Sequence, residues 1–363
     1  MNAGIYLHVP FCAVKCPYCD FYSLPYRKAA AEQYLQAMLR NLRALPPQLP
    51  ADSVYFGGGT PSLLPAASIA EMLGAVRERC ALSADAEITL EANPRTMTAQ
   101  RLRAWKSAGV NRLSVGVQSF RDDILQTLGR NHTAEQAKEA VLQANTAGFS
   151  NLSVDLMLGL PAHTPAVLRE ELETALSLPI THISVYLLKI EEHTPFGENP
   201  PALSDSDETA ERWLQMHEIL TEAGFSHYEI SNFAMPGYES RHNCKYWRCV
   251  PYYGIGPGAH SCHDGVRTAV PRDLQIFNLA ELQPETVTDA NPLTDDERIM
   301  LGLRLGEGIR PADYPAAEQE LLRAAKPLIP QYLREENGTL RMTPEGWLVS
   351  NAVLAQLLRR IET

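Results

Sequence analysis

The sequence lacks a long apolar run, a basic leader and an excess of positive charge. None of its 363 residues belongs to a stretch approaching 18 consecutive apolar residues, so no membrane-spanning helix is expected. The N-terminal segment has neither a basic start nor a long apolar core, so we expect no secretory signal. Lysine and arginine total 32 against 43 aspartates and glutamates, which leaves a net charge of −11. That balance argues against a nucleic-acid-binding surface.

Cysteine is present in an odd number. Seven cysteines in a chain without an export signal argue against a disulfide framework and predict a cytoplasmic location with free or metal-bound thiols. Hydrophobic residues make up 45% of the chain and charged residues 21%, a composition that predicts a folded protein with a sizeable core. The length suits one large α/β domain and a smaller one.

Short apolar runs alternate with helical patterns through the first two-thirds of the chain. The runs, which we interpret as strands, cover residues 5–9, 53–61, 87–94, 112–120, 151–161, 182–190 and 227–234. The helical patterns cover residues 32–45, 66–79, 99–108 and 134–147. This alternation predicts parallel βαβ units, arranged as a full or partial βα barrel or as a doubly wound sheet.

Glycines and polar side chains gather where the predicted strands end. They are residues 57–60, Glu91, Gln118, Asp155 and Glu229. Active sites of parallel sheets lie at the C-terminal ends of their strands. We therefore expect these residues to share one site.

The pattern changes near residue 291. A helix with an N-terminal Thr cap and early acidic residues is predicted there, and a tight turn, a short strand pair and an amphipathic helix close the chain. We predict a barrel domain over 1–265, a linker over 266–290 and a small, mainly α-helical, winged-helix-like domain over 291–363. This last domain either packs against the barrel or serves as a lid or docking surface.

Three cysteines lie within eight residues near the start of the chain. Cys12, Cys16 and Cys19 have the spacing C-x3-C-x2-C, whereas structural zinc sites usually pair two cysteines with two more ligands at a distance. Three thiolates on one loop can hold three irons of a [4Fe–4S] cube and leave the fourth iron open to a small molecule. The alternatives are a zinc site or unliganded thiols.

This loop, followed by the GGGTP segment at 57–61, resembles the signature of the radical S-adenosylmethionine (SAM) superfamily. The resemblance implies a partial (β/α)6 TIM-like barrel, with a [4Fe–4S] cluster on Cys12, Cys16 and Cys19. It also implies that the open iron chelates SAM, which an electron from the cluster cleaves to a radical. Gly58, Gly59 and Thr60 would hold the methionine amino group of SAM, since glycine lets backbone approach a ligand closely.

A closer resemblance covers nearly the whole chain. It is to the oxygen-independent coproporphyrinogen III oxidase-like group and, within it, to the heme chaperone (HemW) branch. The further SAM contacts that it implies are Tyr6, Glu91, Gln118, Arg130 and Asp155. Carboxylates can accept from ribose hydroxyls or an ammonium group, and Arg can bind a carboxylate in bidentate fashion. Each residue could instead be an ordinary cap, ion pair or surface charge.

A second unusual stretch, residues 241–263, is rich in His, Cys and aromatic side chains. Heme needs an axial ligand and an apolar slot, and this composition offers both. The stretch contains the H-N-x-x-Y-W motif that the resemblance associates with heme binding, formed by His242, Asn243, Tyr246 and Trp247. We predict His242 as the axial ligand, with Cys244 and Tyr246 as the next choices. A packed aromatic loop is the alternative.

Two functions fit this resemblance. One is a heme chaperone that delivers heme to hemoproteins, and the other is an oxidase that decarboxylates porphyrinogen propionates. The oxidase resembles C-x3-C-x2-C-x-C, whereas the fourth position here is Phe21. We therefore predict a heme chaperone without coproporphyrinogen oxidase activity, with heme, its donor and recipient hemoproteins as partners. The sequence leaves three further possibilities open: a radical enzyme with another substrate, the binding of a second SAM, and a homodimer.

Overall fold

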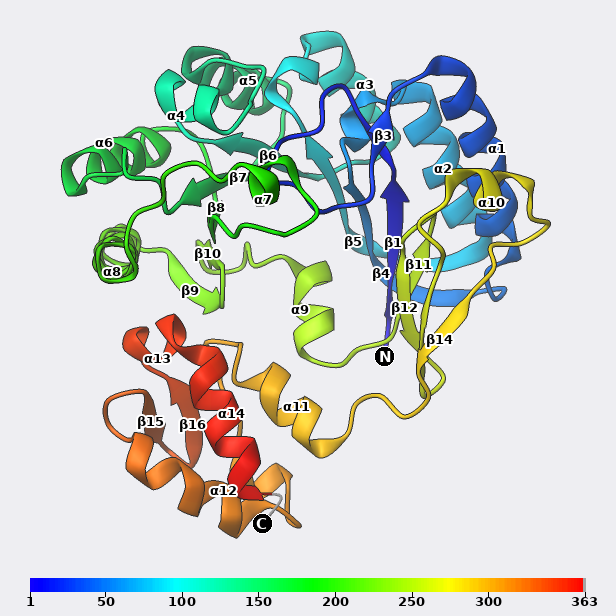
Figure 1. The fold of residues 1–363 in the computed structure, drawn as a ribbon. Helices are drawn as coiled ribbons and strands as arrows, with labels where there is room; N and C mark the ends of the chain where they lie inside the picture. The colour runs from blue at the N-terminus through cyan, green and yellow to red at the C-terminus, as the bar shows by residue number, and fades with distance from the viewer. Residues whose placement is uncertain (362–363) are drawn as a thin grey trace.

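The computed structural model describes the backbone of residues 1–361 and the side chains of residues 1–358. A 12-stranded mixed sheet forms most of this described part, and a small C-terminal module lies beside it (Figure 1). The strand order is β14-β13-β12-β11-β1-β4-β5-β6-β7-β8-β10-β9. Within residues 1–361 we find no helix with both the length and the apolar character needed to span a bilayer.

Six consecutive parallel strands form the centre of the sheet. They are β1 (Ala3–Val9), β4 (Leu49–Gly58), β5 (Cys80–Ala92), β6 (Arg112–Gln118), β7 (Asn151–Leu158) and β8 (His182–Leu187). Helices join each strand to its neighbour: α1 (Lys28–Ala44), α2 (Ala66–Arg79), α3 (Ala99–Ala108), α4 (Asp122–Thr127), α5 (Ala134–Thr146) and α6 (Pro165–Leu176). The predicted partial (β/α)6 barrel is confirmed, and Figure 1 shows it as an open, curved sheet.

Both edges of this parallel core carry added strands. On one side β11 (Tyr252–Ile255) pairs parallel with β1, and β12 (His260–His263), β13 (Val266–Ala269) and β14 (Thr286–Asp289) follow antiparallel. The stretch 266–290, predicted as a linker, thus contributes β13, α10 (Leu274–Leu279) and β14.

The opposite edge differs from the sequence prediction. The predicted single strand 227–234 is wrong, because the chain reverses at Ile230–Ser231 and forms an antiparallel hairpin of β9 (Ser226–Glu229) and β10 (Asn232–Ala234). β10 then pairs antiparallel with β8, and helix α8 (Ser206–Glu222) precedes the hairpin.

Local signals explain where the helices start and stop. α2 and α3 have the predicted bounds, and α1 and α5 differ by a few residues at their ends. Thr98 and Thr133 cap α3 and α5 through their side-chain oxygens, and Thr133 forms a full capping box with Gln136. Gly109 ends α3 in the left-handed region at φ 104°, where a side chain would be strained.

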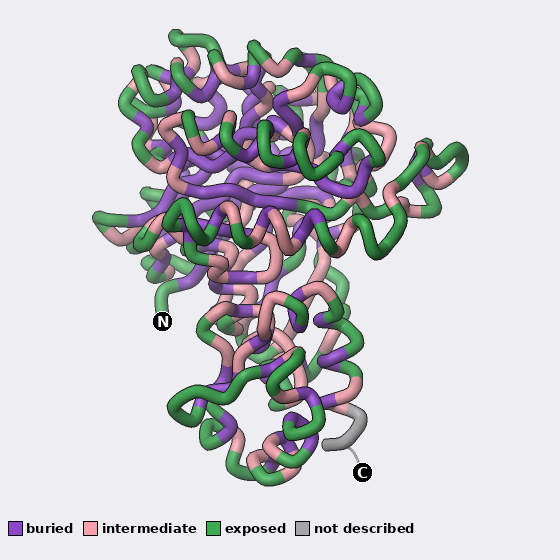
Figure 2. Tube along the Cα trace, turned by 90° about the vertical axis from the view of Figure 1, so that its left-hand side faces the viewer, coloured by how far each residue is buried: buried purple, intermediate pink, exposed green. Residues whose placement is uncertain are grey.

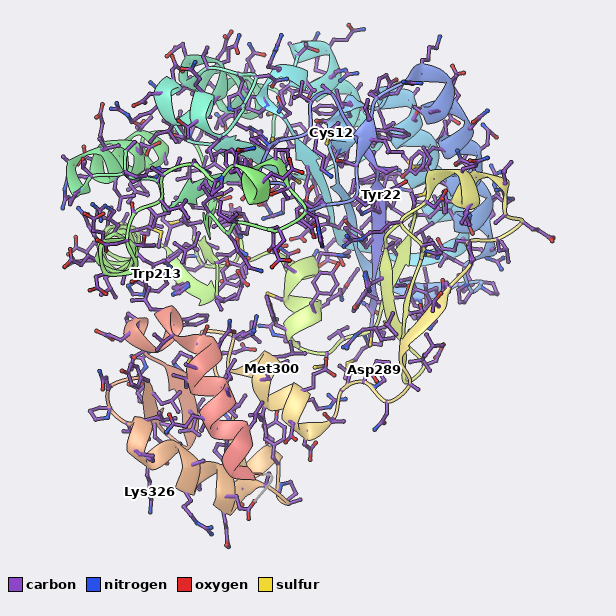
Figure 3. All side chains as sticks on the ribbon, viewed as in Figure 1. Cys12, Tyr22, Trp213, Asp289, Met300 and Lys326 are labelled. Carbon is purple, nitrogen blue, oxygen red and sulfur yellow. The ribbon has the colours of Figure 1, made fainter. Side chains whose placement is uncertain are left out.

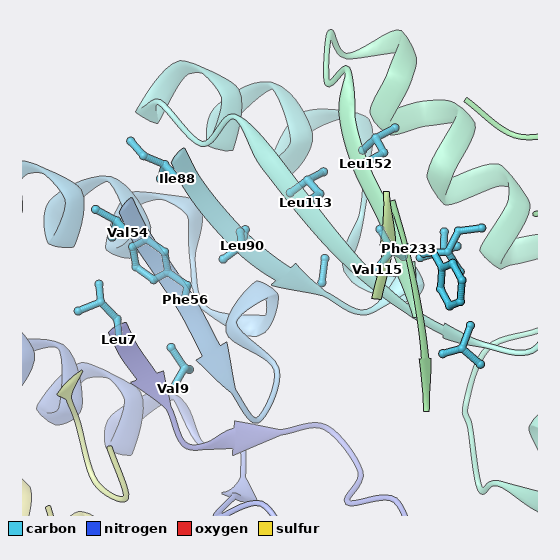
Figure 4. Close-up of a cluster of buried hydrophobic side chains, with 14 of the residues drawn as sticks. Leu7, Val9, Val54, Phe56, Ile88, Leu90, Leu113, Val115, Leu152 and Phe233 are labelled. Atoms are coloured by element: carbon cyan, nitrogen blue, oxygen red, sulfur yellow. The ribbon is translucent and has the colours of Figure 1, made fainter. Parts of the chain in front are cut away.

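The apolar core lies between the strands and the outer helices. Leu7, Val54, Phe56, Leu90 and Leu113 are buried on the outward face of neighbouring strands (Figure 4). Figure 2 shows that burial concentrates in the sheet, whereas the outer turns of the helices are exposed. The inward face of the same strands is instead rich in polar and aromatic side chains, since residues alternate between the two faces of a strand.

The C-terminal module holds short helices and one hairpin. Its elements are α11 (Asp295–Gly302), η3 (Pro311–Asp313), α12 (Glu318–Ala325), η4 (Lys326–Leu328), β15 (Leu333–Glu336), β16 (Thr339–Met342), α13 (Pro344–Leu348) and α14 (Ser350–Ile361). Asn337 and Gly338, both at positive φ, form the predicted tight turn, which in the structure joins the two strands rather than preceding them. The module contacts the β9–β10 hairpin, where the Gly306 N–H donates to the Tyr228 carbonyl at 2.8 Å.

Two glycines provide a matched test of the fold. A Cβ at Gly254 in β11 would lie 2.0 Å from the His260 carbonyl oxygen, whereas a Cβ at Gly74 in α2 meets nothing within 4 Å. We expect Gly254→Ala to lower the free energy of unfolding by about 3 kcal/mol through overpacking. Gly74→Ala should raise it by about 0.5–1 kcal/mol through reduced chain entropy. Urea unfolding measures both, and equal effects would contradict the described β11–β12 contact.

Candidate functional site

A cavity of about 740 Å³ opens at the C-terminal ends of the parallel strands. Its lining includes all three cysteines of the N-terminal loop, and Cys12, labelled in Figure 3, lies beyond the end of β1. Seven other predicted site residues also line it, namely Gly58, Gly59, Thr60, Glu91, Gln118, Arg130 and Asp155. The structure therefore brings together residues from five strand ends, as the sequence predicted.

A short backbone clip positions the cysteine loop. The loop runs from β2 (Phe11–Cys12) to β3 (Leu24–Pro25), two very short strands that pair in parallel. The Tyr26 N–H donates to the Cys12 carbonyl at 3.0 Å, and the Cys19 N–H donates to the Cys16 carbonyl at 3.1 Å. These bonds hold the ends of the loop together and turn its thiols toward one cavity.

The thiols have donors suited to sulfur ligands of a cluster. Arg130 Nη1 lies 3.2 Å from Cys16 Sγ, and Thr60 Oγ1 lies 3.6 Å from Cys12 Sγ. Such donors stabilise thiolate charge and tune a cluster. In residues 1–361 no three His, Cys, Asp or Glu side chains are arranged to hold a single metal ion. A [4Fe–4S] cube takes one thiolate per iron and does not need that arrangement, so the loop fits a cluster.

The glycine run passes close against the cysteine loop. The Gly59 N–H donates to the Val9 carbonyl at 2.8 Å, and the Thr60 N–H donates to the Phe11 carbonyl at 2.7 Å. A Cβ at Gly59 would lie 2.6 Å from the Phe11 carbonyl oxygen, so the approach requires glycine. Gly58 has φ 108°, in the region that favours glycine. The run therefore brings backbone to the cavity wall where a side chain would obstruct it.

Two partly buried carboxyl groups face the cavity from neighbouring parts of the sheet. Glu91 accepts a hydrogen bond from the Tyr55 hydroxyl at 2.8 Å, and Asp155 accepts one from Ser114 Oγ at 3.1 Å. Burial, with a contribution from nearby Asp155, raises the pKa of Glu91 to about 8. Burial also raises the pKa of Asp155. A cationic or hydroxyl-rich ligand would restore the ionised form of these groups.

Gln118 and Arg130 complete the polar wall. Gln118 ends β6 at φ 71°, a left-handed conformation that is uncommon for residues other than glycine and concentrates at functional sites. Arg130 is buried, and its Nη2 donates to the Gly116 carbonyl at 2.6 Å. Its Nε has no hydrogen-bond partner among the described residues. Arg130 thus retains a donor for an anionic group in addition to its bond to Cys16.

Tyr6 does not line the cavity. It lies deeper in the barrel, where its ring stacks on Tyr55 at 6.1 Å and its hydroxyl lies 3.2 Å from His8 Nδ1. Sequence reasoning missed Tyr55, His8 and Ser114, which support the glycine run and the carboxylates. The signal that could have found them is the period of two along each strand, because inward-facing residues alternate with core residues.

Glu229 also lies apart from the cavity. The prediction that it shares the strand-end site is wrong, because it belongs to the edge hairpin β9–β10 rather than to a seventh barrel strand. Its carboxylate accepts hydrogen bonds from Asn232 and Trp247, and burial raises its pKa to about 7. Glu229 therefore supports the contact between the hairpin, α9 (Arg241–Trp247) and the C-terminal module.

The H-N-x-x-Y-W motif forms α9, at the opposite end of the barrel from the cysteine loop (Figure 1). Glu87 anchors this helix, since its carboxylate accepts from the backbone N–H groups of Arg241 and His242 at 3.0 Å each. Lys245 Nζ pairs with Asp52 Oδ1 at 2.6 Å and donates to the Asn2 carbonyl at 2.8 Å. The helix is thereby fixed across the N-terminal ends of β1, β4 and β5.

His242 is sealed inside this arrangement. Its Nδ1 lies 2.9 Å from Ser53 Oγ and its Nε2 lies 2.9 Å from the Tyr246 hydroxyl, so both ring nitrogens are occupied. Burial lowers the pKa of His242 to about 3, which keeps the ring neutral. Cys244 is buried as well, and burial raises the pKa of its thiol to about 12. Trp247 lines a cavity between α9 and the C-terminal module.

Comparison with known proteins places the chain in a family. Residues 6–178 match the model of the radical SAM superfamily, and residues 296–349 match that of the HemN C-terminal domain. The heme chaperone HemW of Escherichia coli strain K12 is 43% identical, with 98% of each chain covered. The chain belongs to the HemW branch of the radical SAM superfamily. Membership in this superfamily implies a [4Fe–4S] cluster and SAM as cofactors.

Further matches support the HemW assignment. The heme chaperone HemW of Synechocystis sp. is 35% identical, with 100% of this chain and 98% of that protein covered. Coproporphyrinogen III oxidase (HemN) from Escherichia coli superimposes with a TM-score of 0.83 over 98% of this chain and 90% of that chain. At 22% identity, this second likeness shows a shared fold.

The pKa of Glu91 gives a test of SAM binding. With a folded pKa near 8, the Glu91 carboxyl is mostly protonated at pH 7, so it would have to lose a proton in order to hold the cationic group of SAM, as the sequence predicts. We expect SAM affinity to fall by about tenfold per pH unit below pH 8. Equilibrium dialysis of anaerobically reconstituted protein between pH 6 and 9 measures this. The control is Glu91→Gln, in which the groups of SAM still titrate but residue 91 does not. The same dependence of SAM affinity on pH in both proteins would contradict a role for Glu91.

The bonds of His242 give a test of stability. His242→Ala removes two buried hydrogen bonds and leaves a cavity, so we expect it to lower the free energy of unfolding by about 2–4 kcal/mol at pH 7. The folded pKa near 3 lies below the unfolded value near 6.5, so acid destabilises the wild-type fold through this residue. The difference between the two proteins should therefore shrink by about 2 kcal/mol from pH 7 to pH 5.

Urea unfolding at both pH values measures this difference. The control is His260→Ala, since His260 is exposed on β12 and its loss should change stability by less than about 0.5 kcal/mol. A His242→Ala protein as stable as this control would show that the bonds to Ser53 and Tyr246 do not hold α9.

Proposed function

We propose that this protein is a heme chaperone, which binds heme and transfers it to recipient hemoproteins while carrying a [4Fe–4S] cluster and SAM. The observation that carries the proposal is the full-length likeness to proteins named heme chaperone HemW, 43% identical in one case and 35% in another. The cavity at the strand ends supports the cofactor part, because it gathers three thiols, a glycine cradle and two carboxyl groups.

The residues divide into cluster ligands and SAM contacts. In this proposal, Cys12, Cys16 and Cys19 bind three irons, and SAM chelates the fourth. Gly58, Gly59 and Thr60 hold the methionine amino end beside Glu91, while Arg130 binds a carboxylate and Gln118 and Asp155 accept or donate to the nucleoside part. When bound, the cluster supplies the electron that cleaves SAM. Tyr6 contributes indirectly in this proposal, because its ring stacks on Tyr55, which donates a hydrogen bond to Glu91.

The alternative function is an oxygen-independent coproporphyrinogen III oxidase. The fold likeness to the E. coli oxidase fits either function, since fold alone does not fix activity. Residue 21 favours the chaperone. Phe21 stands where the oxidase-like pattern has a fourth cysteine, and its ring is 66% exposed at the cavity wall. We propose that the chain lacks the oxidase activity.

The motif on α9 contributes to heme binding in this proposal. His242 could ligate heme iron only after giving up a bond to Ser53 or to Tyr246, and Asn243 and Tyr246 would move with it. Heme-donor proteins and recipient hemoproteins are the partners that a chaperone requires. We also propose a cytoplasmic location, which suits a chain in which none of the seven cysteines, all of them among the described residues, forms a disulfide.

The deciding experiment compares heme with coproporphyrinogen III. The protein is reconstituted anaerobically with iron and sulfide, given SAM and a reductant, and incubated with each compound. We expect heme to bind in a 1:1 ratio, seen as a Soret band, and to transfer to an apo-hemoprotein such as an apo-cytochrome b. We expect no protoporphyrinogen or CO2 from coproporphyrinogen III.

Two controls sharpen this comparison. A protein with Cys12, Cys16 and Cys19 replaced by Ala separates effects of the cluster from heme binding elsewhere. A known oxidase run in parallel shows that the decarboxylation assay works. Turnover of coproporphyrinogen III by the wild-type protein, absent from the triple variant, would overturn the chaperone proposal in favour of the oxidase.

A further inference from the structure

A second cavity, of about 450 Å³, lies between the C-terminal end of α9 and the C-terminal module. Trp247, Arg248 and Cys249 contribute from the end of α9, and the remaining lining comes from the module, including α11, on which Figure 3 labels Met300. No residue is shared between this lining and that of the cluster cavity. The cluster cavity lies at the C-terminal ends of the parallel strands, whereas α9, which borders the second cavity, lies near their N-terminal ends (Figure 1).

Positive charge dominates this cavity. Four arginines line it, Arg248, Arg298, Arg310 and Arg341, against two acids, Glu307 and Asp313. Arg248 pairs with Glu307 at 2.9 Å, which removes one charge of each sign. Among side chains of residues 1–358, none of the other three arginines forms an ion pair with a carboxylate.

The environments of Arg298 and Arg341 suit an anionic ligand, and Arg310 lines the same cavity. Arg298 spends one donor on the Leu293 carbonyl, at 2.8 Å from its Nε. Arg341 has a buried Nε with no hydrogen-bond partner among the described residues. An unpartnered buried guanidinium nitrogen is costly, and a bidentate carboxylate is the partner whose geometry matches it. A ligand with two carboxylates could pair with more of these arginines than a ligand with one carboxylate.

Flat and sulfur-bearing side chains adjoin the arginines. The Trp247 indole lines the cavity. The Arg304 guanidinium lies 5.7 Å from the centre of this ring. Cys249, at the C-terminal end of α9, and Tyr314 also line it, and thiolate and phenolate are both known ligands of heme iron. The cavity therefore combines an aromatic face, carboxylate-binding groups and two side chains of iron-ligating type.

We propose that this cavity binds the propionate edge of heme through Arg298, Arg310 and Arg341, with the macrocycle against Trp247. The proposal rests on the proposed heme chaperone function and adds the site that this function needs. Heme reaches the site without breaking the bonds of His242 to Ser53 and Tyr246. In this arrangement α9 is the wall shared by the barrel and the heme site.

The test is a double variant, Arg310→Gln with Arg341→Gln, compared with Arg323→Gln. Arg323 is exposed on α12 in the same module and does not line the cavity, so it controls for loss of charge. Two probes are titrated anaerobically by their Soret bands, ferric heme and ferric heme dimethyl ester, which lacks free carboxylates. Urea unfolding of every variant confirms that the module remains folded.

The expected result has three parts. Wild-type protein and Arg323→Gln bind heme more tightly than the dimethyl ester, by about tenfold or more, because each charge-assisted bond contributes about 1.5–3 kcal/mol. The double variant loses about tenfold or more in heme affinity and changes little with the ester. Its SAM affinity stays at the wild-type value, since the cluster cavity shares no lining residue with this one.

Three results would overturn the proposal in different ways. A folded double variant that binds heme as tightly as wild type, from a protein that does bind heme, would show that heme lies elsewhere and leave the chaperone function standing. A wild-type protein that binds neither probe would overturn the chaperone function and this site with it. Equal loss of affinity for heme and for the ester would assign the arginines to fold rather than to propionates.

Discussion

One buried, positively charged guanidinium group lies inside this barrel, among carboxyl groups that it helps to keep there. Arg112, at the start of β6, is only 1% exposed, and the nearby carboxyl groups of Glu87 and Asp155 favour its charged form against the cost of burial. A buried charge is stable only with compensating groups, and those groups serve both ends of the barrel. Glu87 anchors α9 at one end, whereas Asp155 faces the cluster cavity at the other. The interior therefore remains polar enough to hold carboxyl groups that an apolar barrel would reject.

This polar interior links two sites that share no lining residue. Tyr55 donates to Glu91 at the cluster cavity, and its ring stacks on His242 of α9 at 5.1 Å. His242 in turn lies 2.9 Å from the Tyr246 hydroxyl. A continuous chain of contacts, from Glu91 through Tyr55 and His242 to Tyr246, therefore joins the cluster cavity to α9.

Local signals predicted what depends on neighbours in sequence. The helices 66–79 and 99–108 and the strand-end cluster around Glu91 and Asp155 follow from periodicity, caps and spacing. The hairpin at 227–234 was missed because Ile230–Ser231 carries no glycine, proline or asparagine to signal a turn. The pairing of β11 with β1, across nearly 250 residues, and the sealing of His242 by Ser53 depend on tertiary contacts that no local pattern encodes.

The sealing of His242 changes how the α9 motif is understood. A histidine, an asparagine and two aromatic residues in one short helix suggest ligation when they are considered alone. In the folded chain, the histidine and one tyrosine satisfy each other inside the barrel, and the tryptophan is left at the surface of the second cavity. A helix with these contacts is well suited to be a rigid wall, because Glu87, Asp52 and Ser53 hold it from three sides. Rigid walls position ligands more accurately than loops do. In our proposal the motif acts mainly through the helix that it stabilises, and the arginines that bind the propionates come from the C-terminal module.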